Sequence, residues 1–170
     1  MGQTYAGIGS RETPPDICKT MTELARQLSQ LGFILHSGGA DGADNAFEQG
    51  AGAKKIFIPW DGFNGRKQDG ETFVVPPYNE VYTTKYHPAA NKLSPAAKRL
   101  MSRNAYQVLG ADLCSPVDFV VCWTKDGKAS GGTGQAIRIA VDRNIPVFNL
   151  KNPTALQELC QYIINRQMLG

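Results

Sequence analysis

Glycine and hydroxyl residues cluster at three places in the sequence, at residues 9–11, 37–44 and 130–134. Glycine lets a ligand approach the backbone closely, and the N–H groups of such loops bind phosphate oxygens. Serine and threonine hydroxyls and an arginine guanidinium add further hydrogen bonds to an anion. The candidate ligand-binding residues in these clusters are Gly9, Ser10, Arg11, Ser37, Gly38, Gly39, Ala40, Asp41, Asp44, Gly131, Gly132 and Thr133.

Each cluster follows a stretch that is typical of a buried β-strand, at residues 3–8, 33–35 and 117–123. In an open parallel sheet, the loops at the carboxyl ends of the strands line one crevice, and ligands bind there. One such loop alone is as well explained by an ordinary tight turn between a strand and a helix. Three of them favour a single phosphate- or nucleotide-binding site.

The rest of the chain alternates between strand and helix patterns. Apolar residues at spacings of three and four predict a helix between Thr13, its expected cap, and Gly32. Ser94 is expected to cap another helix, which ends at Gly110. Further elements are expected at residues 54–59, 134–144, 145–150 and from 152 onward. The order predicts one domain over residues 1–170, a doubly wound α/β fold with a Rossmann-like, mainly parallel sheet of about five strands.

An irregular insert at residues 60–94 interrupts this alternation, and we expect it at the loop end of the sheet. Short strands are expected within it at residues 72–75 and 80–84. Aromatic side chains beside a phosphate site can stack on a base, although packing over the core explains each one better when taken singly. The aromatic residues of the insert are Trp60, Phe63, Phe73, Tyr78, Tyr82 and Tyr86.

Two adjacent polar residues, Arg103 and Asn104, lie in the helix that follows Ser94. Asn104 shares a face with apolar residues, so we expect it to be buried and bonded to the backbone of a glycine loop. We expect Arg103 to reach the crevice and to bind the ligand while contributing little to stability.

The composition excludes some classes of site. The chain has 170 residues, a net charge of +3 and a pI of about 8.7, which suits nucleic acid or phosphorylated ligands without proving either. Its four cysteines are scattered, so no metal site is expected, and no cofactor is expected either. We expect no membrane segment and no signal peptide, and therefore a cytoplasmic protein.

The glycine clusters and the Arg103-Asn104 pair, in this order, resemble the Rossmann-type domain of the DprA/Smf family, part of the SLOG superfamily. That family has a G-[ST]-R loop, an SGxAxGID loop, an RN pair and an SG-[ST] loop. The resemblance implies a nucleotide-type ligand and a homodimer, and small stand-alone versions are typical of phage and prophage genomes. The chain departs from the family in having Ala43 before Asp44, and the usual flanking segments are not expected.

The same superfamily contains the LOG phosphoribohydrolases, whose GGxGTxxE signature carries a catalytic glutamate. Aligning Gly131 on this signature places Gln135 at the threonine and Arg138 at the glutamate. The resemblance therefore implies that LOG-type hydrolysis is absent.

Three functions remain open. The first is binding of a nucleotide or nucleotide-derived phosphate ligand by a sensor, carrier or sequestering protein. The second is DprA-like binding of single-stranded DNA in recombination, with backbone contacts from Arg11, Lys98, Arg99 and Arg103. The third is an N-glycosidase or ribosyl transferase acting on a nucleotide, for which Glu12 and Glu80 are weak catalytic candidates. His36 and His87 are interpreted as structural.

Overall fold

The computed structural model describes residues 3–76 and 85–169. It contains one sheet of six strands in the order β4-β3-β2-β1-β5-β6, and every neighbouring pair is parallel. The strands are β1 (Gln3–Gly7), β2 (Phe33–Ser37), β3 (Lys54–Ile58), β4 (Thr72–Val74), β5 (Phe119–Cys122) and β6 (Val147–Asn149). The predicted fold class is confirmed. The sheet has one strand more than the expected five, because the short strand expected at residues 72–75 of the insert is observed as β4 and joins the edge of the sheet.

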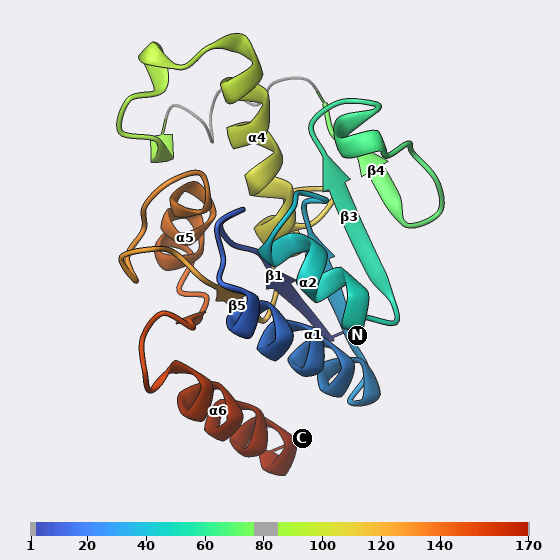
Figure 1. The fold of residues 1–170 in the computed structure, drawn as a ribbon, viewed down its shortest axis with the longest axis vertical. Coiled ribbons are helices and arrows are strands. Elements are labelled where there is room, and N and C mark those ends of the chain that lie inside the picture. Colours follow the sequence, from blue (N-terminus) through green and yellow to red (C-terminus); the bar gives the residue numbers. More distant parts are fainter. Residues whose placement is uncertain (1–2, 77–84, 170) are drawn as a thin grey trace.

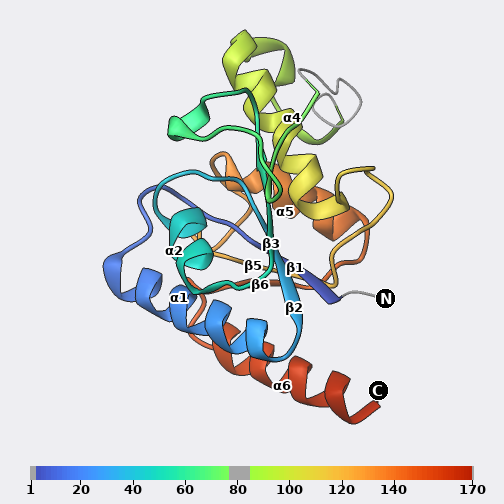
Figure 2. The ribbon, with the colours of Figure 1, turned by 90° about the vertical axis from the view of Figure 1, so that its right-hand side faces the viewer.

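Helices cover both faces of the sheet (Figures 1 and 2). On one face lie α1 (Pro15–Gln30), α2 (Ala43–Gly50) and α6 (Ala155–Leu169), and on the other lie α4 (Pro95–Leu109) and α5 (Thr133–Asp142). Such a doubly wound arrangement follows when each helical crossover between parallel strands is right-handed. All strands therefore end at the same edge of the sheet, where the loops that hold the glycine clusters begin.

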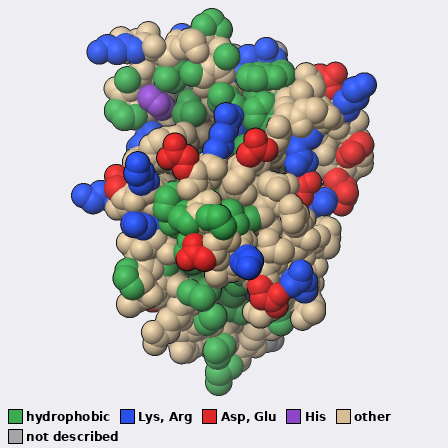
Figure 3. All heavy atoms as spheres, in the orientation of Figure 1, with side chains coloured by type: hydrophobic (Ala, Val, Ile, Leu, Met, Phe, Trp, Pro, Cys, Tyr) green, Lys and Arg blue, Asp and Glu red, His purple; other side chains and the backbone are tan. Residues whose placement is uncertain are grey.

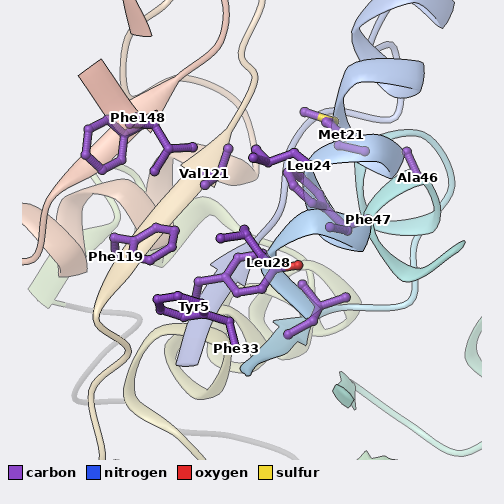
Figure 4. Packing of buried hydrophobic residues seen from close by; sticks show 14 of the residues in the cluster. Tyr5, Met21, Leu24, Leu28, Phe33, Ala46, Phe47, Phe119, Val121 and Phe148 are labelled. Carbon is purple, nitrogen blue, oxygen red and sulfur yellow. The ribbon is translucent and has the colours of Figure 1, made fainter. Parts of the chain in front are cut away.

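The core is divided between the two faces because successive side chains of a strand point in opposite directions. Tyr5 and Phe119 stack with ring centroids 5.6 Å apart, and Phe33 packs edge-on to both, under α1 and α6 (Figure 4). Ala6 and Val120 point to the other face and pack against α4 and α5. Fully burying each large side chain contributes roughly 1.5–3 kcal/mol, so this core holds the strand ends in fixed positions.

Of the two helix N-caps expected from the sequence, one is observed and one is not. Ser94 caps α4 as expected, and its Oγ accepts a hydrogen bond from the N–H of Ala97 at 3.1 Å. The expected cap at Thr13 is wrong, because α1 begins at Pro15 and its N-cap position is Pro14. The Thr13 hydroxyl instead donates to the carbonyl oxygen of Ser10 at 2.6 Å, which braces the first glycine loop.

The insert begins at the carboxyl end of β3, and its residues 72–74 form β4 alongside that strand (Figure 1). Its described aromatic residues pack on the protein itself: Trp60 meets Phe63 edge-on at 5.5 Å between centroids, and Phe73 packs against Phe57. Tyr82 and the strand expected at residues 80–84 lie outside the described residues, as does Tyr78. No helix in the described ranges is long and apolar enough to cross a membrane.

Candidate functional site

A crevice of about 590 Å³ opens where the chain leaves β1 and β5. These strands are neighbours, but β1 continues toward β2 on one side and β5 toward β6 on the other. Their loops diverge at this switch point, which is where ligands bind in open α/β sheets. The lining residues are Ile8, Gly9, Ser10, Arg11, Glu12, Ala40, Asp44, Leu100, Met101, Arg103, Asn104, Gln107, Thr124, Lys125, Ser130, Gly131, Gly132 and Thr133.

The first two glycine loops are in direct contact. Gly42 has a φ of +79°, and a Cβ there would stand 2.6 Å from the carbonyl oxygen of Ser10 and 2.7 Å from the Cα of Arg11. The N–H of Ala43 also donates to that Ser10 oxygen at 3.3 Å. Glycine is required at this position by both the backbone conformation and the lack of space.

The third loop presents the N-terminus of α5 to the crevice. The N–H groups of Gly131, Gly132 and Thr133 donate no backbone hydrogen bond within the described residues. Asn104 holds the loop from α4, since its Nδ2 donates to the carbonyl oxygen of Gly132 at 2.9 Å. The expected burial and backbone bond of Asn104 are observed, with 6% of the residue exposed. Free N–H groups and the helix dipole make this end of the crevice favourable for an anion.

Two exposed basic residues lie at the rim of the same crevice. Arg11 comes from the loop after β1 and Lys125 from the loop after β5, and Glu12 lies beside Arg11. Lys125 lies within a turn in which Thr124 Oγ1 donates to the carbonyl oxygen of Lys128 and accepts from Asn149 Nδ2 at 2.7 Å. The rim therefore combines positive charge with the N-terminus of α5.

The floor of the crevice is a buried polar cluster around Gly38. A Cβ on Gly38 would stand 2.1 Å from Gln107 Nε2, 2.7 Å from Arg103 Nη1 and 2.8 Å from Asp44 Oδ2. Burial raises the pKa of Asp44 to about 6, although the nearby Arg103 charge and the N–H groups of Ala40 and Gly9 oppose this rise. Burial likewise lowers the pKa of Arg103 to about 10.

Arg103 reaches the crevice, but the expectation that it contributes little to stability is corrected by its contacts. Its Nη1 donates to the carbonyl oxygens of Gly38 and, at 3.1 Å, Phe57, and its Nε donates to Asn104 Oδ1. The residue is only 6% exposed. Because this guanidinium donates to buried carbonyl oxygens at the ends of two strands, Arg103 stabilises the fold.

Four of the expected ligand-binding residues do not line the crevice: Ser37, Gly38, Gly39 and Asp41. The Ser37 hydroxyl is buried and donates to the carbonyl oxygen of Gly7 at 2.6 Å, which joins β2 to β1. Asp41 is exposed and accepts from Asn64 Nδ2 at 3.1 Å. Sequence pattern placed these residues in the right loop, but the loop turns only its later part, Ala40 and Asp44, toward the crevice.

Gly39 serves the insert instead of the crevice. Its φ is +70°, and a Cβ there would stand 2.8 Å from Cδ of Arg66. Arg66 donates from Nε to the Gly39 carbonyl oxygen at 3.1 Å and forms an ion pair with Glu48 of α2 at 2.9 Å. The insert is therefore fastened to the second glycine loop through Arg66.

Only one of the two catalytic candidates, Glu12, can be placed at the crevice. Glu12 lines the rim, whereas Glu80 lies outside the described residues. Arg138 does not line the crevice, because its guanidinium donates to the carbonyl oxygens of Tyr86 and, at 3.1 Å, Ala129. His36 is buried under the sheet end, and burial lowers its pKa to about 4.

Sequence reasoning missed several lining residues: Leu100, Met101, Gln107, Thr124 and Lys125. A signal for the α4 members was present, since residues 100, 103, 104 and 107 follow the spacing of one helical face. Three of these four positions hold polar residues, which indicates that this face of α4 lines a site and does not only pack in the core.

No protein-family model and no curated protein matches the sequence. Solved structures that share the fold include the following two. DNA processing protein A from Helicobacter pylori, described as binding single-stranded DNA, aligns with a TM-score of 0.58 and 19% identity over 86% of this chain. This chain spans 64% of that protein. The Moco carrier protein of Chlamydomonas rheinhardtii aligns with a TM-score of 0.55 and 17% identity, over 95% of this chain and 84% of that one.

Proposed function

We propose that this protein binds a nucleotide or nucleotide-derived phosphate ligand in the crevice between β1 and β5, as a sensor, carrier or sequestering protein. The observation that carries the proposal is the set of N–H groups at Gly131, Gly132 and Thr133 that donate no backbone hydrogen bond within the described residues and that line the crevice together with Arg11 and Lys125. A helix N-terminus with basic side chains opposite it is an arrangement that favours phosphate.

The magnitudes are sufficient for useful affinity. Each hydrogen bond to a charged group contributes roughly 1.5–3 kcal/mol, and micromolar binding requires about 8 kcal/mol in all. Three or four such bonds, together with ring burial against Leu100 and Met101, reach that range.

The test is calorimetric titration with a panel of nucleoside monophosphates and with inorganic phosphate at low salt. Lys125→Gln should weaken binding of every phosphate by about tenfold, because one charge-assisted bond is lost. Lys128→Gln is the matched control, since Lys128 is exposed in the same loop but does not line the crevice. Equal effects of the two substitutions, or no binding of any phosphate, would refute the proposal. Native mass spectrometry of protein purified from its host would identify a retained ligand.

Single-stranded DNA binding is the second candidate, and the fold shared with a protein described as binding such DNA is what favours it. On the face drawn in Figure 3, however, Lys and Arg side chains are interspersed with Asp and Glu. Arg99 is also engaged over the ring of Trp60, at 5.4 Å from its centroid. DNA binding predicts a steep fall of affinity with salt, because many counterions are released, whereas a small ligand predicts a shallow one.

The fold shared with a protein described as a Moco carrier suits the carrier form of the proposal. The homodimer implied by the DprA/Smf resemblance is part of the same proposal. Sedimentation equilibrium with and without the bound nucleotide tests it, and a monomer under both conditions would contradict it.

A further inference from the structure

Two polar side chains on the crevice floor are almost fully buried. Asp44 is 3% exposed and Gln107 is 2% exposed, and both line the crevice. Asp44 Oδ2 and Gln107 Nε2 lie 2.8 Å and 2.1 Å from the same point, the position of a Cβ on Gly38. They are therefore close neighbours, although they come from helices on opposite faces of the sheet.

Within residues 3–76 and 85–169 the side-chain amide of Gln107 makes no observed hydrogen bond, and it borders the crevice. A polar side chain that borders a crevice hydrogen-bonds to water there, and a ligand group can replace that water. Asp44 Oδ2 accepts the N–H of Ala40 at 3.3 Å, and the N–H of Gly9 and the Arg103 charge also act on the carboxylate, which when ionised has room for about four hydrogen bonds. Both side chains therefore have unused hydrogen-bonding capacity that a ligand can satisfy.

The two groups differ in what they recognise. A carboxylate only accepts hydrogen bonds, so it pairs with N–H groups and repels ring nitrogens that carry lone pairs. Gln107 offers an amide that donates to a carbonyl oxygen. The combination matches a heterocycle edge with a ring N–H and an exocyclic amine side by side, followed by a carbonyl oxygen.

We propose that the floor of the crevice recognises a 2-amino-4-oxopyrimidine edge, with Asp44 accepting from the ring N–H and the 2-amino group and Gln107 donating to the carbonyl oxygen. Guanine nucleotides and pterins both carry this edge. This inference rests on the proposed function, because it assumes that the crevice holds a phosphorylated heterocycle.

Charge separation within the crevice orients such a ligand. The N-terminus of α5, Arg11 and Lys125 attract the phosphate to the rim, whereas on the floor the charge of Arg103 is offset by that of Asp44. The heterocycle is thereby directed inward, past the apolar side chains of Leu100 and Met101. A crevice of about 590 Å³ falls within the range of roughly 300–1,000 Å³ that is usual for small-molecule sites.

The experiment is calorimetric titration at pH 8 with GMP, IMP, AMP, CMP and 6-carboxypterin. Burial raises the pKa of Asp44 only to about 6, so its carboxyl is ionised at pH 8. GMP should bind about tenfold or more tightly than IMP, which lacks the 2-amino group, and than AMP, which presents a lone pair to Asp44. Binding of 6-carboxypterin that is tighter than that of GMP would support the inference with a pterin as the ligand.

Two substitutions test whether Asp44 and Gln107 on the crevice floor cause the expected preference for GMP. Asp44→Asn should bring the ratio of GMP to IMP affinity close to one, while inorganic phosphate binds as well as before or better. Gln107→Met, which keeps the volume but cannot hydrogen-bond, should weaken GMP by about tenfold. Gln49→Met on the exposed face of α2 is the matched control and should leave all affinities unchanged.

The possible failures are distinguishable. Equal affinities for GMP, IMP and AMP, or a preference for CMP, would overturn this inference and leave the proposed function intact. A GMP preference that survives Asp44→Asn would also overturn it. Absence of binding by every phosphate in the panel would refute the proposed function itself, and the inference with it. If Asp44→Asn fails to fold, the Gln107→Met series still decides between these outcomes.

Discussion

Arg103 of α4 donates a hydrogen bond to the carbonyl oxygen of Gly38 at the end of β2, 65 positions away in sequence. The contact is close enough that a Cβ on Gly38 would stand 2.7 Å from Arg103 Nη1. The glycine is therefore required by the side chains that meet over it. Gly38 belongs to the floor of the crevice, which it shapes without lining it.

Gly38→Ala should lower the free energy of unfolding by about 1–3 kcal/mol, because the new methyl group overlaps three polar side chains in a closely packed site. Chemical denaturation monitored by fluorescence measures the change. Gly70→Ala is the matched control, since a Cβ there meets nothing within 4 Å and should be close to neutral. Equal stability of the two variants would show that the floor can adjust.

Arg103→Gln should lower the free energy of unfolding by roughly 3 kcal/mol, since the carbonyl oxygens of Gly38 and Phe57 lose their donor in a buried site. Arg26→Gln provides the comparison, because Arg26 forms an exposed ion pair with Glu23, and such pairs contribute about 0–1 kcal/mol. A variant at Arg103 that loses ligand affinity but keeps full stability would restore the expectation drawn from sequence.

The pH dependence of stability should report the burial of Asp44. Its folded pKa of about 6 lies above the ordinary 3.8, so the folded state binds the proton more tightly than the unfolded state. This contribution to stability is fully present below pH 3.8 and is lost as the pH rises through 6. The full effect on the free energy of unfolding is on the order of 3 kcal/mol, because each tenfold change in proton affinity corresponds to about 1.4 kcal/mol.

The measurement compares wild type with Asp44→Asn between pH 4 and pH 8. His36, whose pKa burial lowers to about 4, acts in the opposite direction over the same range but is common to both proteins. Arg103 on α4 and Glu48 on α2 also act on Asp44 in opposite directions, and both remain in the variant. The wild type should gain stability relative to Asp44→Asn as the pH falls from 7 to 4. A constant difference would mean that Asp44 is not desolvated.

No LOG-type phosphoribohydrolase activity is expected. Cleavage of the bond to the base builds positive charge on ribose, which a carboxylate must stabilise, as in glycoside cleavage. Arg138 stands where the signature has its glutamate, and its guanidinium is bonded to Tyr86 and Ala129 outside the crevice. Incubation with nucleoside monophosphates should release no free base above background. Release that disappears in Glu12→Gln or Glu80→Gln would favour the glycosidase hypothesis.

The fold class could be predicted from sequence because it depends on patterns within short segments. The sequence alternates between apolar, strand-like stretches and stripes of apolar residues at helical spacing, with glycine loops between them. An alternation of strands and helices predicts a parallel sheet with helices on both faces. Ser94 could be identified as a cap for the same reason, since its partner, the N–H of Ala97, lies three residues away. Thr13 looked equivalent, but its hydroxyl turned back to Ser10 in the preceding loop.

Only the tertiary structure decided which residues of the glycine loops line the crevice and which bind other parts of the protein. Sequence grouped Ser37, Gly38, Gly39 and Asp41 with the ligand, yet their partners are Gly7, Arg103, Arg66 and Asn64, which pack against them from other elements. Gln107 carried no motif, yet it lies beside Asp44 under the crevice. A residue's type states which hydrogen bonds it can make, whereas the chain's path through three dimensions decides which partner is within 3 Å, and contacts between distant segments leave no local trace in the sequence.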